Sequence, residues 1–390
     1  MKLSATNSIN FKGYDAVPLK NLYMLNYSTP SQKDIMEDLQ EIGKKEGFGV
    51  YLEQENKLYD KLGYFQAGIT QYKWSQDNKM IINNGSETEV LLPNNTSSKY
   101  NNLGQILGIH TKAAKTIFDG GNVFLGKKDD GENFLIIGET VLNATSANVR
   151  YEKPVIEDDF EKMLKELMSP ISLKNSEFEI EIVNEGTGEK SFGTINYNSD
   201  EALNRIAKDF NVKKENICVL PQVDYHIDLF IRPIGYPYVL VNDIETAEEL
   251  ETSIFGDLID GKAKEDKKIQ TEKAIKALEE AGFIPIKVPG VFREKRCINF
   301  MNAIVNKHPD GTISYITGSS QNGRKKYEAL EKEFDRILKS KVPNLRNIYH
   351  IGKKMSEKNP SCNQIMEDLF YRQGGLHCLV CEEPDFNKLA

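Results

Sequence analysis

Two polar residues in one short apolar segment are the first candidates for chemistry. The segment Tyr225–Phe230 reads YHIDLF. If it forms a strand, His226 and Asp228 lie on the same face, because side chains alternate along a strand. An imidazole and a carboxylate on a buried strand are costly unless they are used or satisfied by partners. The pattern therefore fits either a catalytic pair or a structural histidine–aspartate hydrogen bond.

A second candidate is a thiol near the C-terminus, in Gly374–Cys381, GGLHCLVC. Gly375 lets the backbone bend or approach a ligand before Cys378. Cys378 and Cys381 also form a CxxC pair, but a redox CxxC usually begins a helix, and the short tail after it predicts none. A structural zinc site needs four ligands, and the other cysteines are isolated (Cys218, Cys297 and Cys362). A reactive thiol and an inert buried cysteine both remain open.

Two further segments carry acidic residues beside distinctive neighbours. Phe118–Gly126, FDGGNVFLG, contains Asp119, Gly121 and Asn122, and taken alone it is typical of a turn into a hairpin. Trp74–Asp77, WSQD, places the only tryptophan next to Gln76 and Asp77. Neither segment alone indicates a function.

The amino-acid composition disfavours several classes of protein. The net charge of 390 residues is −8, which disfavours binding to nucleic acid and favours cationic ligands. An odd number of cysteines, five, with no disulfide spacing, indicates a reducing compartment. No segment has the roughly 20 apolar residues of a membrane helix, and no signal peptide is evident. We therefore expect a cytoplasmic protein without membrane partners, although export without a cleaved signal stays open.

Helices and short apolar strands alternate along the whole chain. Apolar spacing predicts helices at Ser31–Lys45, Val155–Met168, Ser199–Phe210, Thr271–Ala281 and Lys326–Leu338. Apolar runs predict strands at Phe134–Ile137, Phe178–Ile182, Ile217–Leu220, Tyr238–Val241, Ile284–Val288, Ile298–Val305 and Leu376–Val380. The charged run Lys262–Lys268 is expected to be a loop. No linker divides the chain, so we expect one α/β or α+β domain over residues 1–390, with 1–60 as a peripheral part of it.

Taken together and in order, the four motifs resemble the pentein superfamily of guanidine-modifying enzymes. Its members carry an aromatic-x-Gln/Arg-Asp, an acidic-Gly-Gly-Asn, a His-x-Asp and a Gly-x-x-His-Cys near the C-terminus. The resemblance extends from Trp74 to Cys381. It implies an α/β propeller of five ββαβ blades around a pseudo-fivefold axis, with the functional residues at a central funnel.

The resemblance also implies roles for individual residues. Cys378 corresponds to the nucleophile and His226 to the general acid/base. Asp228 and Asp77 correspond to carboxylates that hold a guanidinium, and Asp119 to the acid that orients the histidine, where many relatives have the longer Glu. The remaining positions expected to line the pocket are Trp74, Gln76, Gly121, Asn122, Asn302 and Gly375.

The implied activity is a guanidino-group deiminase that works through a covalent cysteine thiouronium intermediate, without a metal or cofactor. Gln76 is closer to the motif of peptidylarginine deiminases, which favours an arginine within a protein or peptide as the substrate. Two alternatives stay open. One is an amidinotransferase with an amine acceptor, and the other is a non-catalytic pentein that binds a partner. A redox or zinc-binding CxxC protein is a third, unrelated interpretation.

Overall fold

A computed structural model of the chain describes residues 17–25, 30–54, 57–59, 79–83, 87–94, 103–150, 177–183, 190–197, 199–223, 225–243, 245–247, 249–250, 261–290, 299–319, 328–352 and 375–388. These residues form six sheets, five with three strands and one with four. Five of the six sheets share one plan: an antiparallel pair of strands, then a helical connection, then a strand parallel to the second. The repeated unit is therefore ββαβ.

Four of these units follow one another along the chain. The first comprises β4 (Met80–Asn83), β5 (Thr88–Leu92), α2 (Leu103–Leu107) and β6 (His110–Ala113). The second comprises β7 (Val123–Lys127), β8 (Asn133–Gly138), α3 (Glu139–Ser146), α5 (Ser199–Phe210) and β12 (Ile217–Leu220). The third comprises β13 (Ile231–Pro233), β14 (Tyr238–Asp243), α7 (Gly261–Glu280) and β15 (Ile284–Pro289). The fourth comprises β16 (Ile304–Lys307), β17 (Ile313–Gly318), α8 (Glu328–Lys341) and β18 (Leu345–Ile351).

The fifth unit joins the two ends of the described chain. Strand β1 (Leu19–Leu25) pairs antiparallel with the C-terminal strand β19 (Val380–Pro384). It also pairs in parallel with β2 (Gly49–Gln54) across helix α1 (Pro30–Glu46), and β3 (Lys57–Tyr59) extends the sheet. Cys378 lies just before β19, so this pairing fixes the chain that carries the thiol.

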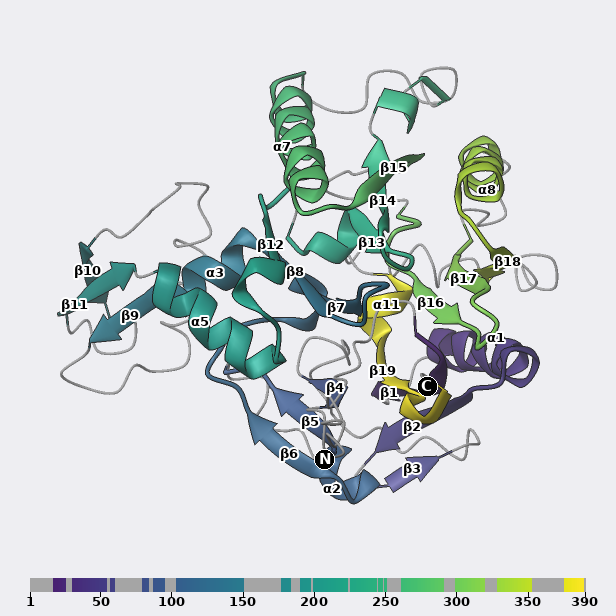
Figure 1. The fold of residues 1–390 in the computed structure, drawn as a ribbon, viewed down its shortest axis with the longest axis horizontal. Coiled ribbons are helices and arrows are strands. Elements are labelled where there is room, and N and C mark those ends of the chain that lie inside the picture. The colour runs from purple at the N-terminus through teal and green to yellow at the C-terminus, as the bar shows by residue number, and fades with distance from the viewer. Residues whose placement is uncertain are drawn as a thin grey trace, which may run out of the picture.

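The sixth sheet is an insertion within the second unit. Its strands are β9 (Ala147–Arg150), β10 (Glu177–Val183) and β11 (Lys190–Tyr197), and they lie at the edge of the molecule beside α3 and α5 (Figure 1). In the same view α1, α7 and α8 lie outside the sheets, whereas α11 (Leu376–Leu379) lies near the middle. None of the described helices is long and apolar enough to cross a membrane.

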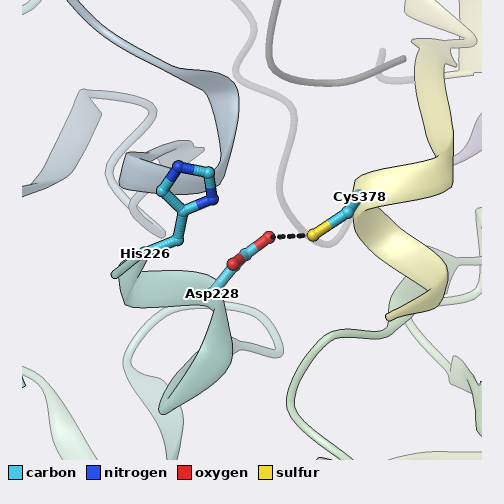
Figure 2. Close-up of side chains that lie close together, drawn as sticks. All are labelled: His226, Asp228 and Cys378. Carbon is cyan, nitrogen blue, oxygen red and sulfur yellow. Dashed lines mark hydrogen bonds between the residues drawn. The ribbon is translucent and has the colours of Figure 1, made fainter. Parts of the chain in front are cut away.

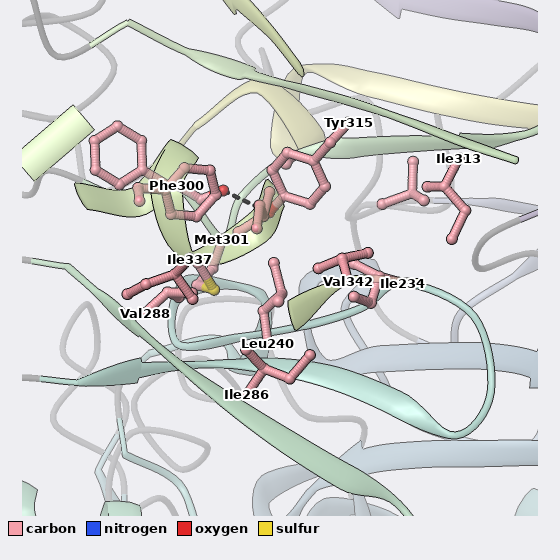
Figure 3. Close-up of a cluster of buried hydrophobic side chains, with 14 of the residues drawn as sticks. Ile234, Leu240, Ile286, Val288, Phe300, Met301, Ile313, Tyr315, Ile337 and Val342 are labelled. Atoms are coloured by element: carbon pink, nitrogen blue, oxygen red, sulfur yellow. Dashed lines mark hydrogen bonds between the residues drawn. The ribbon is translucent and has the colours of Figure 1, made fainter. Parts of the chain in front are cut away.

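A buried aromatic core supports the segment before β16. Phe300 stacks on Phe334 of α8 at 4.6 Å between ring centroids. The Tyr315 hydroxyl donates to the Phe300 carbonyl oxygen at 2.7 Å, as Figure 3 shows. Burying such rings removes a large apolar area from water, which is the main stabilising term for a core. This packed core supports the backbone near Asn302, which lies two residues after Phe300 in the sequence.

Most predicted elements that fall in the described residues are confirmed. Helix α5 and strand β12 have the predicted bounds, and α1, α8, β8, β10, β14 and β15 agree within three residues at each end. Gly282, at φ +85, ends α7 as a left-handed residue with the Gly282 amide donating to the Glu279 carbonyl. The helix predicted at Val155–Met168 lies outside the described residues.

Two predicted strands are wrong over most of their described length, and the strand considered for Tyr225–Phe230 does not form, because local hydrogen bonds replace a ladder. Tyr225–Phe230 contains a 3₁₀ turn, Ile227–Leu229, instead of a strand. Leu376–Val380 is mostly the short helix α11, with β19 beginning at its end. The run Ile298–Val305 becomes a strand only at Ile304, because the Asn299 side-chain oxygen accepts the Met301 amide at 2.8 Å.

The loop predicted at Lys262–Lys268 is also wrong. Helix α7 begins at Gly261 and includes this run, so it is ten residues longer at its start than the predicted helix at Thr271. Lysine, glutamate and alanine are all good helix formers, and their propensity extends the helix although the run has no apolar face. Glu265 and Asp266 of this run are exposed, as a charged run predicts, but its secondary structure was predicted wrongly.

Candidate active site

Cys378 is held by a side chain from a distant part of the sequence. The Asn302 side-chain oxygen accepts the Cys378 amide at 3.0 Å, and the Asn302 side-chain nitrogen donates to Cys378 Sγ at 3.0 Å. The Asn302 carbonyl also accepts the His377 amide at 3.3 Å. At Gly375 a Cβ would lie 2.6 Å from the Asn302 Cβ, so only glycine lets the two segments approach. Asn302 therefore positions the thiol and donates a hydrogen bond to its sulfur.

Asp228 lies next to the thiol on the 3₁₀ turn η4 (Ile227–Leu229). Its Oδ2 atom is 3.5 Å from Cys378 Sγ, and the residue is fully buried. The other oxygen, Oδ1, has no hydrogen-bond partner among the described residues. A buried carboxylate oxygen without a donor is unfavourable unless a ligand supplies one. This atom is consequently a candidate acceptor for a cationic group.

His226 completes the group from the residue before the same turn. Its Nε2 atom is 3.7 Å from Asp119 Oδ2, which is ion-pair distance but longer than a direct hydrogen bond. A Cβ at Gly121 would lie 2.4 Å from His226 Nδ1, so glycine makes room for the ring. The Tyr225 ring packs against the imidazole with centroids 4.3 Å apart, and Tyr225 is exposed. Asp119 and Tyr225 mark the solvent side of the site.

The three side chains come from two separated segments yet lie together, as Figure 2 shows. One ligand-type atom from each of His226, Asp228 and Cys378 lies within 4.8 Å of the others, and all three residues are buried. No other such group of metal-ligating side chains occurs in the described residues. The thiol, however, already accepts a hydrogen bond from Asn302, and Asp228 Oδ2 is occupied. The arrangement suits a thiol nucleophile beside an imidazole that transfers protons.

Asn122 positions the turn that carries the site. Its side-chain oxygen accepts the Ile227 amide at 3.1 Å and the Gln222 side-chain nitrogen at 2.9 Å. Asn122 and Gly121 lie on the 3₁₀ turn η2 (Gly120–Asn122), directly after Asp119. The acidic-Gly-Gly-Asn motif thus supplies one acid, room for the histidine and a support for the turn. The predicted residues Trp74, Gln76 and Asp77 lie outside the described residues.

Three charged or titratable residues behind Asp228 were not predicted as part of the site. His377 Nδ1 lies 3.1 Å from Asp228 Oδ2, and Arg232 Nη2 lies 3.3 Å from Glu382 Oε1. Burial, together with the Arg232 charge, lowers the pKa of His377 to about 4. Burial also raises the pKa of Glu382, which Arg232 opposes. The sequence did contain a signal, because Arg232 interrupts an apolar run and a charge there needs a partner.

The second cysteine of the CxxC pair belongs to a different environment. Cys381 packs with Tyr23, Ile81 and Val90 in a separate buried cluster, and burial raises its pKa to about 12. Neither Cys378 nor Cys381 takes part in a disulfide. A thiol with so high a pKa is a poor nucleophile at neutral pH. Among the described residues, Cys381 belongs to no group of three or more side chains that could hold a metal ion. These two observations disfavour the redox and zinc interpretations of the pair.

Comparison with known proteins finds solved structures that are similar to this chain. No protein-family model and no curated protein sequence matches the chain. Among solved structures, DDAH from Pseudomonas aeruginosa, a Cys-to-Ser variant in complex with citrulline, matches with a TM-score of 0.40 and 8% identity over 94% of this chain and 100% of that one. Agmatine deiminase from C. jejuni matches with a TM-score of 0.54 and 16% identity over 96% of both chains.

The match to agmatine deiminase covers almost the whole of both chains, so it concerns the complete fold and not one motif. The chain has the fold of the pentein superfamily, which confirms the resemblance inferred from its motifs. The repeated ββαβ sheets fit a five-blade arrangement.

Proposed function

We propose that the chain is a guanidino-group hydrolase, a deiminase, with Cys378 as its nucleophile. The observation that carries this proposal is the group of three buried side chains within 4.8 Å: a thiol, an imidazole and a carboxylate with one oxygen still available. A guanidinium is planar and cationic, and a carboxylate binds it with good geometry. Asp228 Oδ1 can therefore hold the substrate's N–H group beside the sulfur.

The proposed reaction has two balanced steps. In the first, Cys378 Sγ bonds as a thiolate to the guanidinium carbon, a carbon–nitrogen bond breaks, and protonated His226 gives a proton to the nitrogen that leaves as ammonia. In the second, the oxygen of water bonds to the same carbon and the carbon–sulfur bond breaks to release the thiolate, while His226 takes one proton of the water and the other goes to solvent. The product is a urea, such as citrulline from arginine. Covalent catalysis replaces one difficult substitution at a delocalised cation with two easier ones.

Neighbouring residues have supporting roles in this proposal. The Asn302 donor at 3.0 Å stabilises negative charge on the sulfur, since hydrogen bonds to a charged group are strong. Asp119, whose Oδ2 lies 3.7 Å from His226 Nε2, helps to keep the imidazole ring in place. Asp77 is proposed as the second carboxylate on the guanidinium from its motif alone.

The substrate is proposed at two levels. At the coarser level it is a small or side-chain guanidino compound, which is supported by the fold shared with an agmatine deiminase. At the finer level, Gln76 favours an arginine within a protein or peptide, and this rests on the sequence motif. We also propose that residues 1–390 form one catalytic domain, that its five blades close into a propeller, and that the protein is cytoplasmic.

The test is a substrate panel with the full chain. Arginine, agmatine, dimethylarginine and an arginine-containing peptide are each incubated with wild type and with Cys378→Ala. The ureido product and the released amine are measured, the amine being ammonia or, from dimethylarginine, ammonia or dimethylamine. We expect equal amounts of released amine and ureido product from at least one of the four compounds with wild type, and none with Cys378→Ala. Transfer of the amidino group to an added amine without ammonia would instead support an amidinotransferase. A chain that neither reacts with nor binds any of these compounds would contradict the proposed function.

A further inference from the structure

Behind Asp228 lies a buried chain of polar residues that the proposed reaction does not use. His377 Nδ1 is 3.1 Å from Asp228 Oδ2, and His377 Nε2 is 3.7 Å from Glu382 Oε1. Glu382 in turn pairs with Arg232, whose side chain is completely buried. These residues come from α11, β19 and β13, so three parts of the fold meet behind one carboxylate.

An aromatic ring fixes the geometry of this chain. The His377 imidazole stacks on Phe124 with centroids 5.8 Å apart and an interplanar angle of 19°. The Arg232 guanidinium lies 5.4 Å from the centroid of the same ring. A stacked ring restricts rotation of the imidazole, so Nδ1 stays directed at Asp228. The contact also places Arg232 near His377 without an ion pair to Asp228.

The buried groups behind Asp228 favour a neutral His377. The positive charge of Arg232 is compensated by Glu382, at 3.3 Å between Nη2 and Oε1. Burial and Arg232 favour neutral His377, because a second buried cation is disfavoured there. A neutral imidazole donates a hydrogen bond to Asp228 Oδ2 and brings no second positive charge to the carboxylate. Asp228 Oδ1 is then available to accept from a cationic substrate.

We propose that His377 is a positioning residue for guanidinium binding. Its Nδ1–H bond holds Asp228 Oδ2, turns Oδ1 toward the substrate, and is itself held by the Phe124 ring and the Arg232–Glu382 pair. This inference rests on the proposed function, because it assigns Asp228 to the substrate. A purely structural histidine would instead contribute only to stability.

The test compares variants that keep or remove the donor at Nδ1. His377→Asn keeps an N–H group close to the position of Nδ1, whereas His377→Leu has a similar volume and no donor. His308→Leu is the matched control, because His308 is also a largely buried histidine beside a carboxylate, Glu46, at 2.8 Å in a different unit. For each variant KM and kcat are measured with the best substrate of the panel. Protection of Cys378 from iodoacetamide by agmatine and by arginine is measured as well, since it reports binding without turnover.

Because a hydrogen bond to a charged group is lost, we expect His377→Leu to raise both KM and the substrate concentration needed for half-protection about 10- to 100-fold. His377→Asn should stay within about threefold of wild type, and His308→Leu should lower thermal stability while leaving KM unchanged. Should His377→Leu fail to fold, His377→Gln replaces it, because its amide reaches the Nε2 position instead and is expected to lose binding.

Equal KM values and protection constants for wild type and the donor-free variant would overturn the positioning role, as would equal losses in His377→Asn and His377→Leu. These outcomes leave the proposed function intact, since wild type still binds and turns over. If no guanidino compound protects or reacts with wild type, the proposed function fails and the positioning role fails with it.

Discussion

At the scale of single residues, the site depends on one asparagine and two glycines as much as on the titratable groups. Asn302 makes two hydrogen bonds to Cys378, one to its amide and one to its sulfur. The sequence suggested that Asn302 lines a pocket, but spacing could not show which residue it contacts, because 76 positions separate the two. Pairing between distant segments is set by packing, which a local pattern does not encode.

Replacing this asparagine should impair chemistry more than binding. In Asn302→Ala the sulfur loses its donor, so we expect kcat and the rate of iodoacetamide alkylation to fall about 10- to 100-fold with little change in KM. Asn133→Ala is the control, because Asn133 is another buried asparagine that bonds to a backbone carbonyl, that of Asn211. Normal alkylation of Asn302→Ala would contradict the role of Asn302 at the sulfur.

The depressed pKa of His377 predicts a dependence of stability on pH. Folding lowers the pKa from its ordinary 6.5 to about 4, so the unfolded state binds more protons between these values. Stability is therefore highest above pH 6.5 and falls as the pH drops toward 4, by roughly 3 kcal/mol from this group. The groups facing His377 are Asp228, Arg232, His226 and Glu382.

Urea unfolding at several pH values checks this prediction. Between pH 6.5 and 4 the free energy of unfolding of wild type should fall more steeply than that of His377→Asn, which has no imidazole to protonate. Parallel curves for the two proteins would show that His377 is already protonated in the folded state. A protonated His377 would place a second buried positive charge beside Asp228 and so disfavour a cationic substrate there.

At the scale of elements, the site is built from short turns that the sequence pattern assigned to strands. His226 lies just before a 3₁₀ turn, Asp228 lies on that turn, and Cys378 lies on a one-turn helix. Periodicity identified α5 and β12 because long apolar patterns are determined by burial on one face. It failed at Tyr225–Phe230 because a side chain, Asn122, replaces the neighbouring strand as the hydrogen-bond partner. In a strand, side-chain alternation would place His226 and Asp228 on one face. In the structure, the 3₁₀ turn brings their side chains close together instead.

The close approach of η2 to His226 gives a prediction at this scale. In Gly121→Ala the new methyl group would meet His226 Nδ1 at 2.4 Å, so the ring must move. A displacement of about 1 Å from reactive geometry can cost about 100-fold in rate, and we expect a loss of that order in kcat.

The control is Gly311→Asn, at a turn with φ +80 and open space, because asparagine tolerates that conformation. The control should retain the activity of wild type. Full activity in Gly121→Ala would mean that the ring position seen here is not the one used in the reaction.

At the scale of the whole molecule, the motifs in order predicted the fold better than any element did. Five sheets repeat one ββαβ plan although no repeat is visible in the sequence, because the plan is specified by burial and hydrogen bonding and not by identical residues. The sequence could not show that β1 pairs with β19, since the two strands lie at opposite ends of the chain. It also did not predict that the charged residues Arg232 and Glu382 meet behind the site.

The pairing of the terminal strands should be essential to stability. Leu22 is completely buried in the middle of β1, so Leu22→Ala should lower the free energy of unfolding by about 2–5 kcal/mol. Ile269→Ala is the control, because Ile269 is exposed on α7 and its truncation should cost about 0.5 kcal/mol or less. Denaturant titrations of both variants measure the difference. Similar stabilities would contradict a structural role for the β1–β19 sheet.

The central claim is that Cys378 Sγ forms a bond to the carbon of a guanidinium, and intact mass measured on acid-quenched enzyme during turnover tests it most directly. We predict an adduct equal to the substrate less ammonia, found on the peptide that contains Cys378 and absent from Cys378→Ala. An adduct that holds only the amidino group would identify an amidinotransferase with the same nucleophile. Turnover by Cys378→Ala, or an adduct on another residue, would contradict the account.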